Sequence, residues 1–412
     1  MKPVIVIADD LTGAADTGVC FRRAGLSVQI VFSTGQEPCA DVLVYSSESR
    51  HAGEVEARSK VRRLLPAAQE AAFIYKKIDS TLRGSPGAEL AEIMSGLGLE
   101  KALVAPAFPA QGRTTLDGKQ LIHGQPIEGS SFPGEAAGSD LKAAFQACQR
   151  AMLSVSLNAL RDNPDAVLEI FSKPGPAVIL GDAESEGDLR VLADAALQSG
   201  LRLFCGSAGL AAALADRLRQ KGFSQEALPF RGQKGPILVI AGSRNGVSVG
   251  QVETARNAGV RVFELDPDLG PTPDPPTREV LAASRALDLG QDAVLTTSNS
   301  FNSCLGEAGV AERLGQWARI LVDRHAIGGL VLTGGDVAMA VISALSADGI
   351  RLESELLPGI PLGILVGGAR PDLPVITKAG GFGSPGTLVQ AIQFLRAAGE
   401  MGGHAYLETR QN

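Results

Sequence analysis

The sequence predicts a two-domain α/β protein in which each domain has a mainly parallel sheet flanked by helices on both faces. Short apolar runs, typical of buried strands, alternate with amphipathic helical stretches through almost the whole chain. Such alternation is typical of parallel sheets that helices cover on both faces. The length of 412 residues also suits two domains of about 200 residues each better than one core.

The first half of the chain contains six runs that we expect to form strands. They read, in order, PVIVIAD, DVLVYS, AFIYKKID, KALVAPAF, AVILGDA and RLFCGS. Each is followed by a helix-like stretch or a long loop. The first leads into TGAADTGVCFRRAG, a helix-like segment that Gly25 closes.

The second half starts a fresh series of the same kind. Its strand-like runs are PILVIAG, VRVFELD, DAVLTTS, GGLVLTGG, IPLGILVGG and LPVITKAGGFG. Between the two series, around residues 222–235, Gly, Pro and charged residues mix without any periodicity. We therefore expect one domain over residues 1–230 and a second over residues 231–412.

The composition argues against several classes of protein. The formal net charge is −7, whereas a general nucleic-acid binder would carry a basic stripe. No apolar run reaches the roughly 20 residues of a membrane span, and the N-terminus lacks the pattern of a signal peptide. The five cysteines are scattered without a CxxC pair, as expected for reduced thiols. We expect a cytoplasmic protein that binds neither nucleic acid nor membranes.

Charged and polar residues gather at the ends of the predicted strands of the first domain. Ligands of open parallel sheets bind beyond the carboxyl ends of the strands. The side chains at these ends include Asp9, Asp10, Ser49, Arg50, Lys76, Lys77, Asp79, Ser80, Thr81 and Arg83. Carboxylates can hold hydroxyl groups or take a proton, Arg offers a planar fork to a carboxylate, and Lys offers a compact charge. The combination suits a hydroxylated acid as the ligand.

Two structural alternatives stay open for these residues. Asp9 and Asp10 precede a predicted helix, so they could serve as an N-cap with an ion pair. Lys76 and Lys77 could simply be a solvated strand edge.

Glycine-rich turns follow three predicted strands of the second domain. ILVIAGSRNGVS, VLTGGDVAMAV and ITKAGGFGSPGTLVQAI each run from strand to Gly-rich turn to helix. Glycine lets backbone N–H groups approach a phosphate at a helix N-terminus, where the helix dipole favours negative charge. One such turn is weak support, but three in one domain indicate a nucleotide site. Neither a GxxxxGK[ST] loop nor a GxGxxG fingerprint after the first strand of either half is present.

A metal site built by the protein is not expected. The four histidines show neither HExxH nor HxH spacing.

Six motifs give the chain a resemblance to the four-carbon acid sugar kinases. They are IADDLTGAADTG, YSSESR, YKKIDSTLRGSPGAEL, APAFPAQGRTT, LTGGD and KAGGFGSPGTL. The resemblance covers nearly the whole chain, and KKIDSTLRG and APAFPAQGRTT in their correct order are highly specific. Members of this family have an N-terminal domain that binds the sugar acid and a C-terminal domain that binds the nucleotide.

The resemblance implies a set of binding residues. The sugar acid would contact Asp9, Arg50, Lys77, Ile78, Asp79 and Ser80, and ATP would contact Ser243, Gly334, Gly335, Asp336, Val337 and Gly380. Beside these we expect Arg83 in the acid site and Gly381 in the nucleotide site, from the strand-end and Gly-rich patterns.

The expected reaction is transfer of the γ-phosphate of ATP, with Mg²⁺ bridging its phosphates, to the terminal hydroxyl of a four-carbon acid such as D-threonate, D-erythronate or 3-oxo-tetronate. We expect Asp10 or Asp79 to accept the hydroxyl proton, because Asp9 is the better substrate contact.

Two alternative functions stay open. The protein could be a nucleotide-regulated sugar-acid sensor without turnover, or an aldolase or epimerase acting on the phosphorylated acid. The expected partners are the sugar acid and ATP, with a homodimer as one arrangement of the protein.

Overall fold

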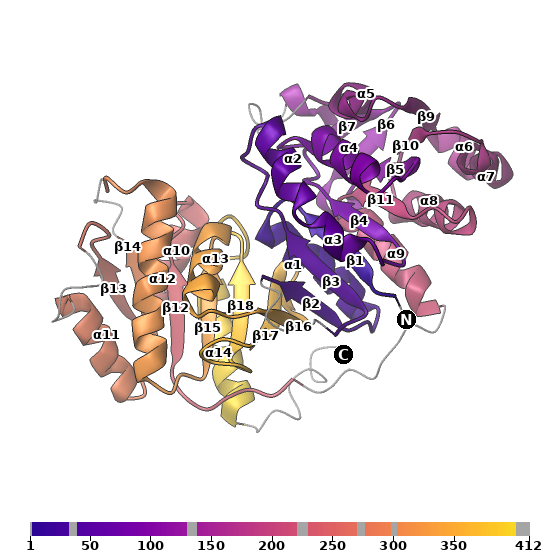
Figure 1. Cartoon of the computed structure of the whole chain (residues 1–412). Coiled ribbons are helices and arrows are strands. Elements are labelled where there is room, and N and C mark those ends of the chain that lie inside the picture. Colours follow the sequence, from indigo (N-terminus) through magenta and orange to yellow (C-terminus); the bar gives the residue numbers. More distant parts are fainter. Residues whose placement is uncertain are drawn as a thin grey trace. The chain divides into compact units, whose positions relative to one another are not determined.

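The structure, a computed structural model, describes residues 2–32, 39–129, 138–220, 230–269, 277–297 and 303–400. The chain divides into two compact units, which are residues 1–31 with 38–226 and residues 32–37 with 227–412. The domain boundary expected near residue 230 adjoins residues 221–229, which lie outside the described residues, and it stays a prediction. Figure 1 shows that each unit combines a sheet with helices packed on it.

The described strands of the first unit form a fully parallel sheet in the order β2-β3-β1-β4-β11-β5-β10-β9. Their bounds are β1 Val4–Ala8, β2 Val28–Val31, β3 Val42–Ser46, β4 Ile74–Lys77, β5 Lys101–Ala105, β9 Ala151–Val155, β10 Ala177–Gly181 and β11 Leu203–Gly206. A small antiparallel sheet joins β6 Arg113–Leu116, β7 Lys119–Ile122 and β8 Gln125–Pro126. All six strands expected in this half are therefore present, and the parallel arrangement is confirmed.

The helices of the first unit pack on the large sheet. They are α1 Leu11–Arg23, α2 Glu54–Arg62, α3 Leu65–Ala68, α4 Pro86–Gly96, α5 Leu141–Ala144, α6 Leu157–Asp162, α7 Pro164–Ser172, α8 Glu186–Gln198 and α9 Ala208–Gln220, with short 3₁₀ turns at Pro109–Gln111, Ile127–Gly129 and Gln146–Cys148. Helix α9 packs between α1 and α8, whereas α2 packs against α4. The core on the α2/α4 side joins Ile5 and Ile74 of the sheet to Val61 and Leu90 of these helices.

Strand β4 sends its last two side chains to opposite faces of the sheet, as strand geometry requires. Lys76 points to the α4 side, where its Nζ lies 2.5 Å from Oε2 of Glu89, and both side chains are fully buried or nearly so. Lys77 points to the α1 side. The two adjacent lysines therefore have separate environments, and neither is a solvated edge.

The described strands of the second unit follow the order β13-β14-β12-β15-β18-β17-β16. Their bounds are β12 Ile237–Ala241, β13 Arg261–Leu265, β14 Ala293–Thr297, β15 Gly329–Thr333, β16 Gly349–Leu357, β17 Ile360–Val366 and β18 Pro374–Lys378. The first five strands of this order are parallel, and β17 is antiparallel to both of its neighbours. Only Pro358 and Gly359 separate β16 from β17, and a two-residue connection can join antiparallel strands alone.

The helices of the second unit are α10 Gly246–Asn257, α11 Arg278–Asp288, α12 Gly306–Arg324, α13 Gly335–Ala344 and α14 Thr387–Glu400. Helix α12 packs on α13, and α10 packs on α14. Trp317 of α12 is buried in the interior. Within the described part of the chain, no helix has the length and apolar character needed to cross a membrane.

The two units begin with the same winding. From the first strand the chain passes through a helix to a strand two places away, returns to the place between them, and then crosses to the other side of the first strand. The connections of β1 and β4 thus leave in opposite directions, as do those of β12 and β15. In doubly wound sheets such a switch point leaves a crevice at the carboxyl ends of the strands, where ligands bind.

The buried Lys76–Glu89 ion pair generates a prediction about stability. In Lys76→Met, Glu89 is left buried without its cation, so the free energy of unfolding should fall by about 3–5 kcal/mol. Adding Glu89→Leu should recover most of this loss, because an apolar pair can replace a buried ion pair at little cost. Urea denaturation of both variants measures the difference. Equal stabilities of the single and double variants would show that the pair is not what holds β4 to α4.

Candidate active site

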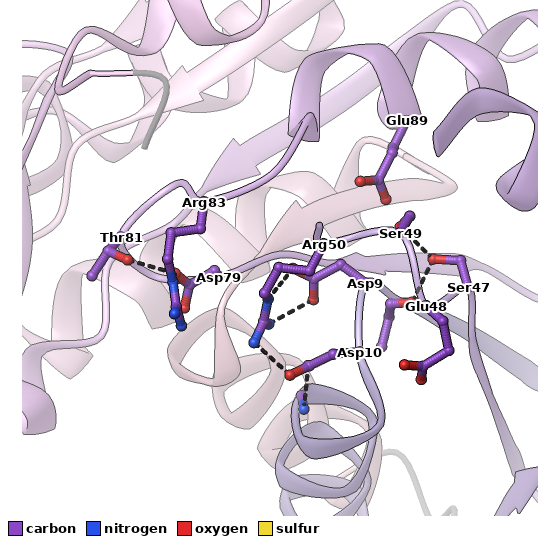
Figure 2. Close-up of polar contacts among 12 residues, drawn as sticks. Asp9, Asp10, Ser47, Glu48, Ser49, Arg50, Asp79, Thr81, Arg83 and Glu89 are labelled. Carbon is purple, nitrogen blue, oxygen red and sulfur yellow. Dashed lines mark hydrogen bonds and ion pairs between the residues drawn. The ribbon is translucent and has the colours of Figure 1, made fainter. Parts of the chain in front are cut away.

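Asp9 and Arg50 form the centre of the site at the end of β1 (Figure 2). Asp9 directly follows β1 and is almost completely buried. Arg50 follows β3, and its Nε and Nη2 each donate to one carboxylate oxygen of Asp9 at 2.9 Å. The backbone N–H groups of Ser49 and Arg50 also donate to the carbonyl of Asp9, at 2.9 and 3.2 Å. Burial would raise the pKa of Asp9, but Arg50 and then Lys77 hold this pKa below its ordinary value.

Asp10 is the N-cap of α1, as one of the structural alternatives proposed. Its Oδ1 accepts a hydrogen bond from the backbone N–H of Gly13 at 2.7 Å. Its Oδ2 accepts one from Nη1 of Arg50, so the guanidinium bridges both carboxylates. The pKa of Asp10 is raised, chiefly by burial and further by the charge of Asp9, although Arg50 opposes the shift. A carboxylate with a raised pKa is the better proton acceptor.

Asp79 has the opposite electrostatic environment. Its Oδ2 accepts hydrogen bonds from Nε of Arg83 at 2.6 Å and from the hydroxyl of Thr81. Burial would raise the pKa of Asp79, but the hydrogen bond from Arg83 and the charge of Arg50 outweigh it and hold the pKa far below the ordinary value. Asp79 therefore stays ionised and is a weak base, which makes it a poorer candidate for proton transfer than Asp10.

Lys77 is the cation of this site that has no direct partner among the described residues. A Cβ atom on Gly13 would lie 2.8 Å from Nζ of Lys77, so the ammonium group rests on the first turn of α1. No described carboxylate lies within ion-pair distance of Nζ, and no described group accepts a hydrogen bond from it. Its charge nevertheless lowers the pKa values of Asp9, Asp10 and Asp16. A nearly buried ammonium group without an ion-pair or hydrogen-bond partner among the described residues can bind an anionic ligand.

The other residues expected in the acid site are Ile78, Ser80 and Arg83, and each has a different environment. Ile78 is buried in the hydrophobic core, so only its backbone can contact a ligand. The carbonyl of Ser80 accepts a hydrogen bond from Nε2 of the buried Gln120 at 2.7 Å. Arg83 holds Asp79.

Sequence reasoning missed Asp16 and Gln120. Asp16 lies on α1 near Lys77, and burial raises its pKa. Its place three residues after Gly13, on the same face of the predicted helix, was the available signal. No sequence pattern pointed to Gln120, because its contact with Ser80 depends on how the β6–β7 hairpin folds back.

All three Gly-rich turns of the second unit open into one cavity of about 510 Å³. The size is typical of small-molecule sites. Its lining consists of Gly242, Ser243, Arg244, Asn245, Thr297, Ser303, Gly306, Glu307, Val310, Ala311, Gly334, Gly335, Asp336, Val337 and Gly380. The structure thus brings together all the expected nucleotide residues except Gly381, which is not in the lining. Arg244 and Asn245 were missed, although they belong to the same turn as Ser243.

The N-terminus of α13 presents free backbone donors to this cavity. Gly334 precedes the helix with φ +98°, a conformation that favours glycine, and no side chain caps the helix. The N–H groups of Gly335, Asp336 and Val337 have no acceptor among the described residues. Uncapped N–H groups together with the helix dipole form a site for an anion such as a phosphate.

Gly380 approaches Ser243 so closely that no larger residue fits without movement. A Cβ atom at position 380 would lie 2.2 Å from Oγ of Ser243. The turn after β18 and the turn after β12 therefore meet at the cavity.

Comparisons with known proteins match the two units to two different domain models. Residues 4–214 match the model of a sugar-binding N-terminal domain, and residues 238–388 match that of a nucleotide-binding C-terminal domain. The chain is 37% identical to a D-threonate kinase of Salmonella typhimurium, with 95% of this chain and 98% of that protein covered. It is 29% identical to a D-erythronate kinase of Heliobacterium modesticaldum, with 96% and 97% covered.

A solved structure of a Haemophilus influenzae protein has the same fold, with a TM-score of 0.76 at 21% identity over 94% of this chain and 98% of that one. The two domain models and the full-length similarity to curated kinases lead to one conclusion: the chain belongs to the four-carbon acid sugar kinase family.

Proposed function

We propose that this protein transfers the γ-phosphate of ATP to the terminal hydroxyl of a four-carbon sugar acid, with D-threonate as the first candidate. The observation that carries the proposal is the Lys77 ammonium group, which has no direct partner among the described residues and lies beside the Asp9–Arg50–Asp10 cluster. The choice of D-threonate is supported by relatives of that name in Salmonella typhimurium and Bordetella bronchiseptica, at 37% and 34% identity.

In this proposal the acid is bound by charge on one side and by hydroxyl acceptors on the other. The ammonium of Lys77 binds the carboxylate of the acid, and Asp9 accepts hydrogen bonds from its hydroxyl groups. Nε, Nη1 and Nη2 of Arg50 already donate to Asp9 and Asp10. Arg50 therefore holds the two carboxylates in place and is a weaker candidate for binding the acid itself than the sequence suggested.

Asp10 is our candidate for the group that accepts the hydroxyl proton. Its raised pKa favours it over Asp79, whose pKa is strongly lowered. Asp79, fixed by Arg83, then has the role of an ionised neighbour that orients the acid.

The phosphates of ATP are proposed to bind the backbone N–H groups at the start of α13 and in the turn at Gly380. The carboxylates of Asp336 and Glu307 line the same cavity, and carboxylate and phosphate oxygens are the ligands that Mg²⁺ prefers. These residues fit a Mg²⁺ ion held mainly by the nucleotide. When bound, the ion would neutralise charge on the phosphate oxygens.

The homodimer and the cytoplasmic location expected from the sequence stay proposals. Light scattering would test whether the protein is a dimer.

The first test concerns the anion site. ADP release with D-threonate, D-erythronate, 3-oxo-tetronate and a neutral tetritol should show turnover with one or more acids and little with the tetritol. Lys77→Met should raise KM for the acid at least about 10-fold, because a charge-assisted contact is lost, and should change KM for ATP less than about twofold. A tetritol phosphorylated as well as the acid would contradict binding through the carboxylate.

The second test separates Asp10 from Asp79. Asp10→Asn keeps an N-cap, since Asn caps as well as Asp, but removes the basic group, so kcat should fall about 10²–10⁴-fold with little change in melting temperature. In the unmodified enzyme, kcat should decline as the pH falls through the raised pKa of Asp10. Asp79→Asn should lower kcat less and affect KM for the acid more. A kcat for Asp10→Asn within about tenfold of the original would rule Asp10 out as the base.

The third test locates the nucleotide. Gly380→Ala places a Cβ atom 2.2 Å from Oγ of Ser243, whereas Gly386→Ala has no neighbour closer than 3.9 Å and is the matched control. Gly380→Ala should weaken ATP binding in calorimetry by on the order of 10-fold or more, as expected for overpacking, and Gly386→Ala should not. Unchanged ATP affinity in a folded Gly380→Ala protein would place the nucleotide elsewhere.

A further inference from the structure

The Gly-rich turn after β18 is held by one face of α10. Oγ of Ser248 donates to the carbonyl of Gly380 at 2.7 Å. Nε2 of Gln251 donates to the carbonyls of Phe382 and Ser384, at 3.0 and 2.9 Å. Three carbonyls of one turn therefore point to two side chains a single helical turn apart on α10.

A planar trans peptide points its N–H group opposite to its C=O group. With the carbonyls of Gly380 and Phe382 turned to α10, the N–H groups of Gly381 and Gly383 point away from that helix. Gly380 itself lines the nucleotide cavity.

Lys378 connects this turn to the start of α13. Its carbonyl accepts the N–H of Gly334, the N-cap of α13, at 2.9 Å. Its ammonium group donates to Oγ of Ser248 at 3.3 Å and reaches the carbonyl of Gly380 at 3.5 Å. One residue thus links both phosphate-facing turns to α10.

The three side chains are buried, and polar groups are costly to bury unless their contacts are needed. Ser248, Gln251 and Lys378 are 1%, 0% and 4% exposed. Oε1 of Gln251 has no hydrogen-bond partner in the described part of the chain. The amide is therefore used only for its donors, and a carboxylate of the same shape could not replace it.

We propose that Ser248, Gln251 and Lys378 are a positioning network that turns the N–H groups of the Gly380 turn toward the phosphates of the bound nucleotide. The inference rests on the proposed function, because it takes the cavity of the second unit as the ATP site. These residues touch neither the acid nor the reacting atoms in this proposal. They act through the backbone of the turn, so their loss should affect ATP more than the acid.

The main test is Gln251→Glu, in which a carboxylate faces two carbonyl oxygens and cannot donate to them. KM for ATP should rise on the order of 10-fold to 100-fold, the range expected when buried hydrogen bonds are lost, with KM for the acid within about twofold. Ser248→Ala and Gln251→Met, which bury no new charge, should raise KM for ATP less and keep the fold. Gln233→Met is the matched control, because it removes an amide that donates to the carbonyl of Asp372, a residue that does not line the cavity.

Lys378 offers a second readout. Burial lowers its pKa to about 8, and no charged side chain contributes to the shift. No described carboxylate forms an ion pair with it. The cation is therefore present below about pH 8 and lost above it, so KM for ATP should rise between about pH 7 and pH 9.5. In Lys378→Met, KM for ATP should already be high at pH 7 and change little over this range.

The outcomes distinguish the network from the proposed function. If Ser248→Ala, Gln251→Met and Lys378→Met lower the melting temperature but leave KM for ATP within about twofold, the network is merely structural and the inference is wrong. If they raise KM for ATP selectively, it is supported. If Gly380→Ala also leaves ATP binding unchanged, the cavity is not the nucleotide site, and the proposed function loses its ATP site together with the inference.

Discussion

The bidentate ion pair between Arg50 and Asp9 is the interaction on which the first site depends. It ties the segment after β3 to the end of β1, and the backbone N–H groups of Ser49 and Arg50 strengthen the link by donating to the carbonyl of Asp9. Because the same guanidinium also reaches Asp10, two carboxylates can lie side by side in a buried place. Without Arg50 their repulsion and burial would favour protonation of at least one of them. Because Arg50 already holds these carboxylates, they form no ion pair with Lys77, whose ammonium group has no direct partner among the described residues.

The two units share one initial order of strands and connections but differ in the residues that follow the strands at the switch point. In each, the first strand and the strand that crosses to its other side end at a switch point, and the residues that follow them form the site. After β1 these residues are aspartates, so the first site is made of charged side chains. After β12 and β15 they are mostly small residues and glycines, so the second site is made of backbone N–H groups and a helix dipole. Charged side chains suit a small acid with hydroxyl groups, and backbone donors suit phosphates.

Part of this was predictable from sequence, because the strands and their ends follow from local patterns, whereas the order of the strands in each sheet does not. The alternation of runs predicted the parallel sheets, and the strand-end rule found Asp9, Arg50, Lys77 and the Gly-rich turns. It did not separate Lys76 from Lys77, since only the fold shows that one is neutralised by Glu89 while the other faces α1. The antiparallel hairpin of β16 and β17 was also not expected, because its second strand has the same continuous apolar character as a buried parallel strand.

The opposite pKa shifts of Asp10 and Asp79 give physical grounds for dividing their roles. Both are aspartates at neighbouring strand ends, and both are largely buried, which alone would raise both pKa values. The difference lies in their donors. Asp79 has Arg83 and Thr81 on one oxygen and the charge of Arg50 nearby, whereas Asp10 shares Arg50 with Asp9, whose negative charge opposes its ionisation. Two carboxylates whose environments push their pKa values apart are typical of sites in which one takes a proton and the other stays charged. Arg50 lowers the pKa of both aspartates, so the separation comes from the hydrogen bond that Arg83 donates to Asp79 and from the charge of Asp9 beside Asp10.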